Sequence, residues 1–314
     1  MMLFGLDASR LQAQRLADRL GLGIAAHEER EFEDTEFKIR ALESVRGQDV
    51  LVYHSLYADE HGSASDKLCR LLFFIGALND ASASRVCAIV PYIAFSRKDR
   101  RTKSRDPITT RYVAQMFESI GLDGIVTADV HNVAAFENAF RCNKINVTAA
   151  GVIGEHFVAA AVQSSRITVV SPDVGGVKRA RAFASAFSER LGKEVGLAFI
   201  EKHRSEGIVS GDLFAGDVRD SFVIIIDDLI SGGTTMARAA RACRAQGASA
   251  VHGAATHGLL SPGCVATLDV PELDSIVVTD TAGDVRARCP QLGEKLVVLA
   301  TAGLFADAAR RIID

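Results

Sequence analysis

The stretch "FVIIIDDLISGGTT" occupies residues 222–235 and joins an apolar run to two adjacent acids and a loop of small residues. The apolar run is typical of a buried parallel strand. Ligands of an open parallel sheet bind beyond the carboxyl ends of the strands, where Asp227 and Asp228 would lie. The N–H groups and hydroxyls of residues 231–235, just before a helix, favour a phosphate. Two carboxylates beside that phosphate would hold ribose hydroxyls or a divalent cation.

A simpler interpretation gives these residues a structural role. Asp228 or Ser231 would cap the following helix, and Gly232 and Gly233 would make a tight turn. This interpretation explains one acid, but it does not explain two acids at the end of an apolar strand. We therefore favour a ligand site.

Short apolar runs alternate with helical patterns along the rest of the chain. The apolar runs predict strands at 49–55, 85–92, 124–131, 167–173, 195–202, 222–228, 250–258, 273–280 and 295–301. Apolar spacings of three and four residues predict helices at 64–81, 109–121, 150–162, 177–192 and 234–247. Near-continuous apolar strands followed by helices imply an α/β fold whose parallel sheets are covered by helices on both faces.

The length of 314 residues favours two domains over one. The strand and helix pattern restarts after residue 148. "NDASASRVCAIVPY" (79–92) and "AQGASAVHGAATHG" (245–258) both run from a helix end through small residues into a strand. This short similarity supports two related domains.

Composition and charge exclude several classes of protein. The net charge of -3 argues against nucleic-acid binding through charge alone. No apolar stretch is long enough to span a bilayer, and the N-terminus lacks the pattern of a signal peptide. The six cysteines are scattered without a CxxC pair, which is typical of reduced thiols. We therefore expect a cytoplasmic protein without membrane or nucleic-acid partners.

The 222–235 loop resembles the phosphoribosyl diphosphate loop, which phosphoribosyltransferases share with the ribose-phosphate diphosphokinase (PRPP synthetase) family. Six further segments resemble the second family, in the family's order and across both halves of the chain. They are "FEDTEF" (32–37), "ESVRGQDVLV" (43–52), "PYIAFSRKDRRTKSRDPITTRYVAQMFESIG" (91–121), "TADVHN" (127–132), "VVSPDVGGVKRARAFA" (169–184) and "IEKHR" (200–204).

The resemblance implies transfer of the diphosphate of ATP to C1 of ribose 5-phosphate, which gives PRPP and AMP for nucleotide biosynthesis. Such chemistry needs Mg²⁺ and cations over the developing charge. The resemblance also implies two phosphoribosyltransferase-like domains. Residues 1–147, rejoined by the last helix at 303–314, would form the ATP side, and residues 148–302 the ribose 5-phosphate side. The chain has no GxxxxGK[ST] segment, and "GLGIAA" (21–26) is interpreted as a helix stop.

The resemblance assigns ATP binding to two segments and one histidine. Phe32 would stack on adenine, and Asp34 and Glu36 would accept its hydrogen bonds. Arg97 and Lys98 would contact the triphosphate, although the family usually has Gln at the second position. The dense basic run from Arg97 to Arg105 has two other interpretations, a solvated loop or an RNA contact.

Two metal-linked residues follow from the resemblance. His131 would connect the metal to the ATP phosphates, although a lone histidine is more often structural. Asp173 would be the second metal ligand, and its alternative role is that of a turn residue before two glycines. The resemblance assigns ribose 5-phosphate to Asp227, Asp228, Ser231, Gly232, Gly233, Thr234 and Thr235.

Lys202 and Arg204 would carry catalysis from a mobile loop. Two cations there would close over the β- and γ-phosphates and stabilise the transition state. The alternative is a solvated surface pair.

In this family a neighbouring subunit commonly completes the ATP site, so the resemblance implies a homo-oligomer built on dimers, up to a hexamer. The last residues, "AARRIID", lack the family's Ser-bearing regulatory tail, so we expect no regulation by phosphate and ADP. Two other functions stay open: a phosphoribosyltransferase that uses PRPP, and a non-catalytic regulatory paralogue. The first would leave "FEDTEF" and the basic run without a role.

Overall fold

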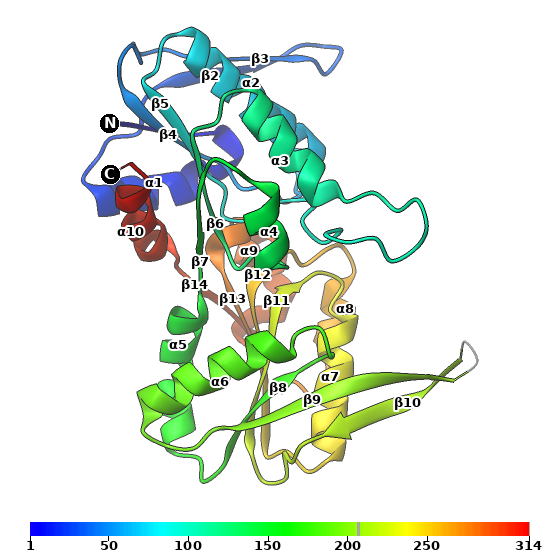
Figure 1. The fold of residues 1–314 in the computed structure, drawn as a ribbon. Helices are drawn as coiled ribbons and strands as arrows, with labels where there is room; N and C mark the ends of the chain where they lie inside the picture. Colours follow the sequence, from blue (N-terminus) through cyan, green and yellow to red (C-terminus); the bar gives the residue numbers. More distant parts are fainter. Residues whose placement is uncertain (206–207, 314) are drawn as a thin grey trace. The chain divides into compact units, whose positions relative to one another are not determined.

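The computed structural model describes residues 1–205 and 208–313, without side chains for residues 202–213. The chain forms two compact units. Unit 1 consists of Met1–Thr148, Thr281–Gly283 and Ala300–Asp314, and unit 2 of Ala149–Asp280 and Asp284–Leu299. Each unit has a mainly parallel sheet with helices on both faces (Figure 1), which confirms the predicted α/β class.

The sheet of unit 1 has the order β1-β4-β5-β6-β7, with every neighbouring pair parallel. Its strands are β1 Met2–Gly5, β4 Asp49–Tyr53, β5 Arg85–Ile89, β6 Gly124–Ala128 and β7 Asn143–Val147. The helices of unit 1 are α1 Arg10–Leu20, α2 Ala64–Asp80, α3 Thr109–Ser119, α4 Val133–Ala139 and α10 Ala302–Ile313, with the 3-10 helix η1 Asp7–Ser9. Gly21 ends α1 in the left-handed conformation, which confirms the predicted helix stop.

The C-terminal helix α10 packs on unit 1. It contacts α1, β5, β6 and β7 and covers the same face of the sheet as α1, while α2 and α3 lie on the other face (Figure 1). Phe305 of α10 is fully buried and meets the ring of Tyr53 edge-on, with the ring centroids 6.3 Å apart. Residues 300–313 therefore help to build the core of a unit that begins almost 300 residues earlier.

A two-stranded antiparallel hairpin, β2 His27–Glu31 and β3 Phe37–Ala41, lies over α2. Glu28 forms ion pairs with Arg40 and Lys38 across the strands. Phe37 packs against Phe73 of α2, with the ring centroids 5.4 Å apart. The apolar pattern did not predict this hairpin, because most of its strand residues are charged and packing on α2 stabilises it.

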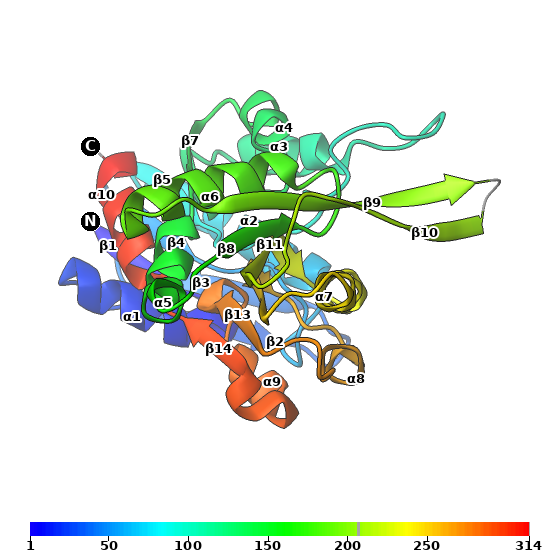
Figure 2. The same ribbon diagram turned by 90° about the horizontal axis from the view of Figure 1, so that it is seen from below.

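The sheet of unit 2, over the described residues, has the order β10-β9-β8-β11-β12-β13-β14. Its strands are β8 Ile167–Ser171, β9 Gly196–Ser205, β10 Ile208–Ala215, β11 Phe222–Ile230, β12 Ala250–Gly258, β13 Ser275–Thr279 and β14 Leu296–Leu299. The helices are α5 Ala150–Val162, α6 Val177–Leu191, α7 Thr234–Ala245, α8 Cys264–Leu268 and α9 Val285–Arg288, with the 3-10 helices η2 Asp280–Ala282 and η3 Pro290–Lys295. Figure 2 shows α5 and α6 on one side of β8 and β11, and α7 and α8 on the other.

One strand departs from the predicted parallel arrangement. β10 pairs antiparallel with β9 at the edge of the sheet, and the two strands form an arm that extends from unit 2 (Figure 1). The sequence did not predict β10, because an edge strand that extends from the sheet needs no continuous apolar run.

We predict that Phe305→Ala destabilises unit 1 by about 3–5 kcal/mol, because it removes a buried aromatic ring from a well-packed core. Urea unfolding followed by circular dichroism measures this change. Asp307→Ala, on the exposed face of the same helix, is the control and should change stability by less than about 0.5 kcal/mol. Equal stability of the two variants would show that α10 does not support the core.

Candidate functional site

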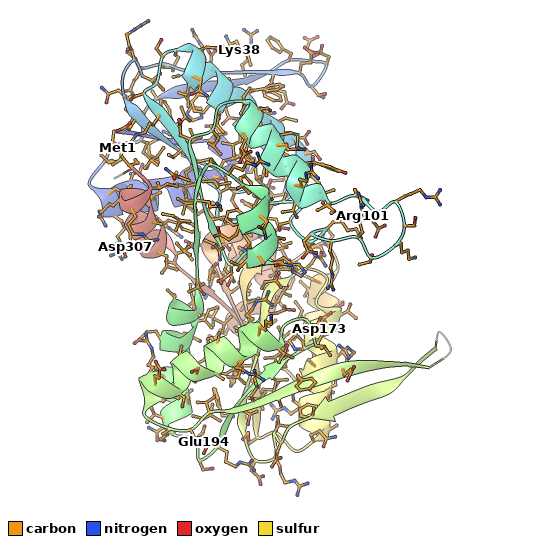
Figure 3. The ribbon with its side chains drawn as sticks, viewed as in Figure 1. Met1, Lys38, Arg101, Asp173, Glu194 and Asp307 are labelled. Atoms are coloured by element: carbon orange, nitrogen blue, oxygen red, sulfur yellow. The ribbon has the colours of Figure 1, made fainter. Side chains whose placement is uncertain are left out.

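The order of the strands reverses between β8 and β11 in unit 2. These two strands pair in parallel, with Phe222 opposite Ile167. The chain leaves β8 through α6 toward β9, and it leaves β11 through α7 toward β12 on the other side. Open α/β sheets bind ligands at such a switch point, beyond the carboxyl ends of the strands. Asp173 follows β8, and Figure 3 shows it beside the start of α6.

The two acids of the opening stretch lie near the end of β11. The side chain of Asp228 is 5% exposed and that of Asp227 is 21% exposed. Burial, together with the adjacent carboxylate of Asp228, raises the pKa of Asp227 to about 8. A buried pair of carboxylates is costly unless cations or hydroxyl donors meet it. The pair is therefore suited to ribose hydroxyls or a divalent cation.

Arg179, in the first turn of α6, contacts both acids. Its Nη1 atom lies 3.2 Å from Oδ1 of Asp227 and 3.5 Å from Oδ1 of Asp228. Arg179 was not predicted as a site residue from the sequence. A signal was present, because a cation in the first turn of a helix is unfavourable for the helix dipole and so needs a partner. Only the fold shows that the partner is the acid pair.

The small residues after β11 form a turn that leads into α7. Gly233 has a φ of 80°, and a Cβ there would lie 2.5 Å from the side chain of Leu268 in α8. A larger residue at this position would therefore be strained as well as crowded. No side-chain hydrogen bond caps the start of α7 within the described residues. The N–H groups of this turn are therefore suited to a phosphate.

The next loop of unit 2 supports the same turn. The N–H of Leu260 donates to the carbonyl of Ile230 at 3.0 Å, and the N–H of Ser261 donates to the carbonyl of Ser231 at 3.3 Å. Gly232 and Thr234 are exposed, whereas Ser231 and Thr235 are partly buried. The structure therefore places Asp227 and Asp228 near the end of β11 and the other predicted ribose 5-phosphate residues in the turn that follows and at the start of α7.

Asp173 has the turn role that the sequence left open as an alternative. Its Oδ1 accepts from the N–H of Gly176 at 3.0 Å, and its carbonyl accepts from the hydroxyl of Ser171 at 2.6 Å. These bonds hold the turn between β8 and α6. Its metal role stays a prediction.

The basic loop, residues 97–106, connects β5 to α3 in unit 1, and Figure 3 shows Arg101 on its outer part. Asp106 organises the loop, because its carboxylate accepts from the ammonium of Lys98 and from the N–H groups of Thr102 and Lys103. These bonds, that from Lys98 above all, hold the pKa of Asp106 well below its usual range. Lys98 thus shapes the loop, while Arg97 is exposed.

His131 is exposed and follows β6 at the same edge of the sheet. The side-chain amide of the next residue, Asn132, donates to the carboxylate of Asp99 in the basic loop. Asn132 also caps α4, since its Oδ1 accepts from the N–H of Ala135 at 3.2 Å. The structure therefore brings His131 together with the segment that holds Arg97.

The predicted adenine-binding residues lie elsewhere in unit 1. Phe32, Asp34 and Glu36 occupy the turn of the β2–β3 hairpin, and Phe32 is 41% exposed. The guanidinium of Arg30 lies 5.3 Å from the centre of the Phe32 ring. Figure 1 shows the hairpin turn well separated from the basic loop. Unit 1 of one chain therefore does not bring Phe32 next to Arg97.

The prediction that Lys202 and Arg204 lie in a loop was wrong. Both lie in β9, where Lys202 pairs with Asp212 of β10 and Arg204 pairs with Val209. The physical reason is that β10 offers an antiparallel partner, so the backbone continues as a strand beyond the edge of the sheet. Their side chains lie outside the described part of the structure, and their catalytic role stays a prediction.

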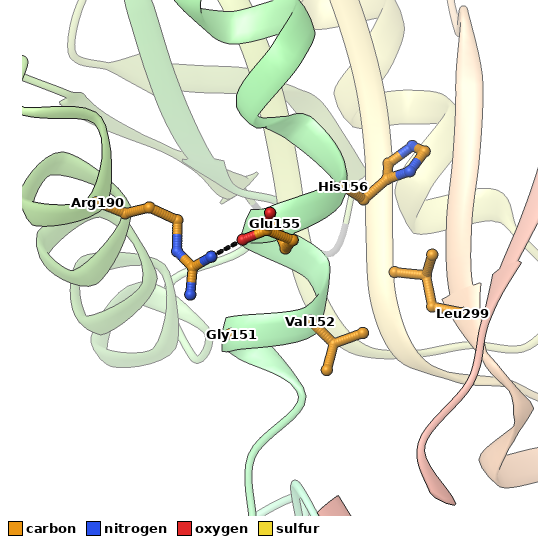
Figure 4. Close-up of a pocket in the computed structure, with 6 residues that line it drawn as sticks. All are labelled: Gly151, Val152, Glu155, His156, Arg190 and Leu299. Carbon is orange, nitrogen blue, oxygen red and sulfur yellow. Dashed lines mark hydrogen bonds and ion pairs between the residues drawn. The ribbon is translucent and has the colours of Figure 1, made fainter. Parts of the chain in front are cut away.

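A cavity of about 480 Å³ lies in unit 2 between α5, α6 and β14 (Figure 4). Glu155 and Arg190 form an ion pair at its wall. It is lined by Gly151, Val152, Glu155, His156, Arg190 and Leu299. These residues include none that the sequence assigned to a site, so the switch point is the better candidate.

Two family models match the chain. The N-terminal domain of ribose phosphate pyrophosphokinase matches residues 1–121, and the phosphoribosyl synthetase-associated domain matches residues 212–314.

Full-length relatives agree with these models. A ribose-phosphate pyrophosphokinase of Hyphomonas neptunium is 35% identical over 100% of this chain and 97% of its own length. That of Haemophilus ducreyi is 35% identical over 99% of this chain and 95% of its own. The crystal structure of phosphoribosylpyrophosphate synthetase from Mycobacterium smegmatis has a TM-score of 0.89 and 32% identity, and the match covers 99% and 98% of the two chains. The chain belongs to the ribose-phosphate pyrophosphokinase family.

Proposed function

We propose that the chain transfers the diphosphate group of ATP to C1 of ribose 5-phosphate, which gives PRPP and AMP. The observation that carries the proposal is the buried acid pair, Asp227 and Asp228, beside an N–H turn at the switch point of unit 2. Relatives named for this reaction match the chain along its whole length. Unit 2 would hold ribose 5-phosphate, and unit 1 would hold ATP.

The residues of unit 2 would position the acceptor. The N–H groups of the turn at 231–235 would bind the 5-phosphate. Asp227 and Asp228, when ionised, would accept from the ribose hydroxyls and fix the direction of the hydroxyl on C1. Positioning of this kind supplies a large part of the rate of phosphoryl transfer.

The donor set at the switch point fits Mg²⁺, because the carboxylates of Asp173, Asp227 and Asp228 are the hard oxygen ligands that this ion prefers. His131 would link a metal-bound triphosphate to unit 1. When bound, Mg²⁺ would neutralise the charge that develops on the phosphate oxygens. Arg97 would hold the triphosphate, and Lys202 and Arg204 would stabilise the charge of the transition state.

A second copy of the chain would complete the ATP site. The hairpin turn with Phe32, Asp34 and Glu36 lies away from the basic loop of its own unit. We therefore propose a homo-oligomer built on dimers, in which the partner's hairpin turn meets the basic loop. None of the helices over the described residues is long and apolar enough to cross a membrane. ATP and ribose 5-phosphate are metabolites of the cytoplasm, where we place the enzyme.

We predict that Lys202→Ala lowers kcat by at least about 100-fold, because it removes a cation over the transition state. Binding of ATP should change little. An assay that supplies ATP, ribose 5-phosphate and Mg²⁺ and follows AMP by chromatography measures turnover, and equilibrium dialysis measures ATP binding.

The wild-type chain is the reference in the same assay. AMP formed together with a product that a phosphoribosyltransferase consumes supports the proposed function. ATP binding without AMP would indicate a regulatory paralogue, and consumption of added PRPP with a nucleobase would indicate a phosphoribosyltransferase. Unchanged turnover of Lys202→Ala would remove this residue from the mechanism.

We predict that Asp227→Asn weakens ribose 5-phosphate binding but stabilises the folded protein at pH 8. The raised pKa of Asp227 means that the folded state binds a proton between about pH 4 and 8 that the unfolded state has released. Wild-type stability therefore falls as the pH rises through this window. The variant avoids this loss, so its advantage at pH 8 over pH 5 should be at least about 1 kcal/mol. Urea unfolding at both pH values measures it, and equal pH dependence would contradict the assignment.

Mixing of inactive variants tests the shared ATP site. Phe32→Ala and Lys202→Ala would each be inactive alone. After unfolding and refolding together, mixed oligomers should recover activity, because some sites would combine a normal hairpin turn with a normal Lys202. Asp227→Asn and Lys202→Ala, which we assign to the same chain's part of the site, form the control, and their mixture should show no more activity than the two variants measured separately. No recovery in either mixture would place Phe32 in the same chain's site or outside the site.

A further inference from the structure

Two arginines at the switch point of unit 2, Arg179 and Arg238, connect the two strand–helix pairs that meet there. Arg179 starts from α6, which follows β8, and reaches the acids of β11 at 3.2 and 3.5 Å. Arg238 starts from α7, which follows β11, and its Nη2 donates to the carbonyl of Pro172 at 3.0 Å. Pro172 directly precedes Asp173. Thus an arginine of α6 contacts the end of β11, and an arginine of α7 contacts the segment that follows β8.

Arg179 lies where a cation is costly. It belongs to the first turn of α6, which contains no acid, and the positive end of the helix dipole disfavours a guanidinium there. Its side chain is 27% exposed, so water does not fully solvate the charge. The nearby carboxylates offset both costs. This arrangement indicates that the position of Arg179 is set by the acid pair and not by the stability of α6.

We propose that Arg179 and Arg238 are positioning residues that brace the switch point, with Arg179 orienting the carboxylates of Asp227 and Asp228 for the ribose hydroxyls. This inference rests on the proposed function, because it assigns the acids to ribose 5-phosphate. Arg238 holds the turn of Asp173 in place relative to the acid pair. These contacts therefore fix the positions of the Asp173, Asp227 and Asp228 carboxylates relative to one another before substrate binds.

The test compares Arg179→Gln with Arg179→Lys and with Arg181→Gln. Arg181 is exposed on the same helix, so its variant is matched in charge and chemistry. Binding of radiolabelled ribose 5-phosphate, with Mg²⁺ and without ATP, is measured at neutral pH. Thermal unfolding shows that each variant is folded.

For Arg179→Gln we expect about tenfold weaker binding, as the loss of a charge-assisted hydrogen bond predicts. Arg179→Lys should lose less affinity than Arg179→Gln, because it keeps the charge beside the acid pair. Arg181→Gln should match the wild type. The proposal is overturned if Arg179→Gln binds as tightly as the wild type, or if Arg181→Gln weakens binding equally.

If Arg179→Gln does not fold, the lysine variant decides, and binding equal to the wild type would overturn the proposal. If the wild type binds no ribose 5-phosphate, the proposed function fails, and stability without substrate then tests the brace. Arg179→Gln should lose more stability than Arg181→Gln, because it leaves the acid pair without its cation. Equal stability of the two variants would reject the brace.

Discussion

Two neighbouring carboxylates in a poorly solvated position of unit 2 repel each other when both are ionised. A guanidinium group that contacts both of them offsets this repulsion. Asp227 and Asp228 are adjacent in β11, and Arg179 contacts both of them from a different strand–helix pair. Burial, with the neighbouring carboxylate of Asp228, raises the pKa of Asp227 to about 8 in spite of this contact. The acid pair can therefore still bind a metal ion and accept hydrogen bonds from the hydroxyls of a sugar.

The sheet topology explains why this compensation is available. Because the strand order reverses between β8 and β11, the helices that follow them lie on opposite faces of the sheet. Arg179 of α6 therefore reaches the end of β11, and Arg238 of α7 reaches the segment after β8. In unit 1 a hydrogen bond between Asn132 and Asp99 joins two segments in a comparable way, and it places His131 near the basic loop. In both units, polar contacts between loops position the candidate residues.

The sequence predicted the buried strands and amphipathic helices well, because their apolar spacing reflects the core. The helix at 150–162 and the strand at 250–258 agree with the structure at both ends. The β2–β3 hairpin was missed because its residues are charged and its stability comes from α2. Arg179 was missed because its partner lies 48 residues away along the chain. Lys98 was assigned to ATP, but only the folded loop shows that Asp106 neutralises it. Family resemblance, and not spacing, supplied the roles of Phe32 and His131.

A crystal structure of the chain with ribose 5-phosphate and Mg²⁺ tests the central claim most directly. We expect the 5-phosphate to lie against the N–H groups of residues 231–235 and the ribose hydroxyls against Asp227 and Asp228. We also expect Arg179 to remain in contact with the acid pair. Ribose 5-phosphate bound away from the switch point, with the acid pair facing only solvent, would contradict it.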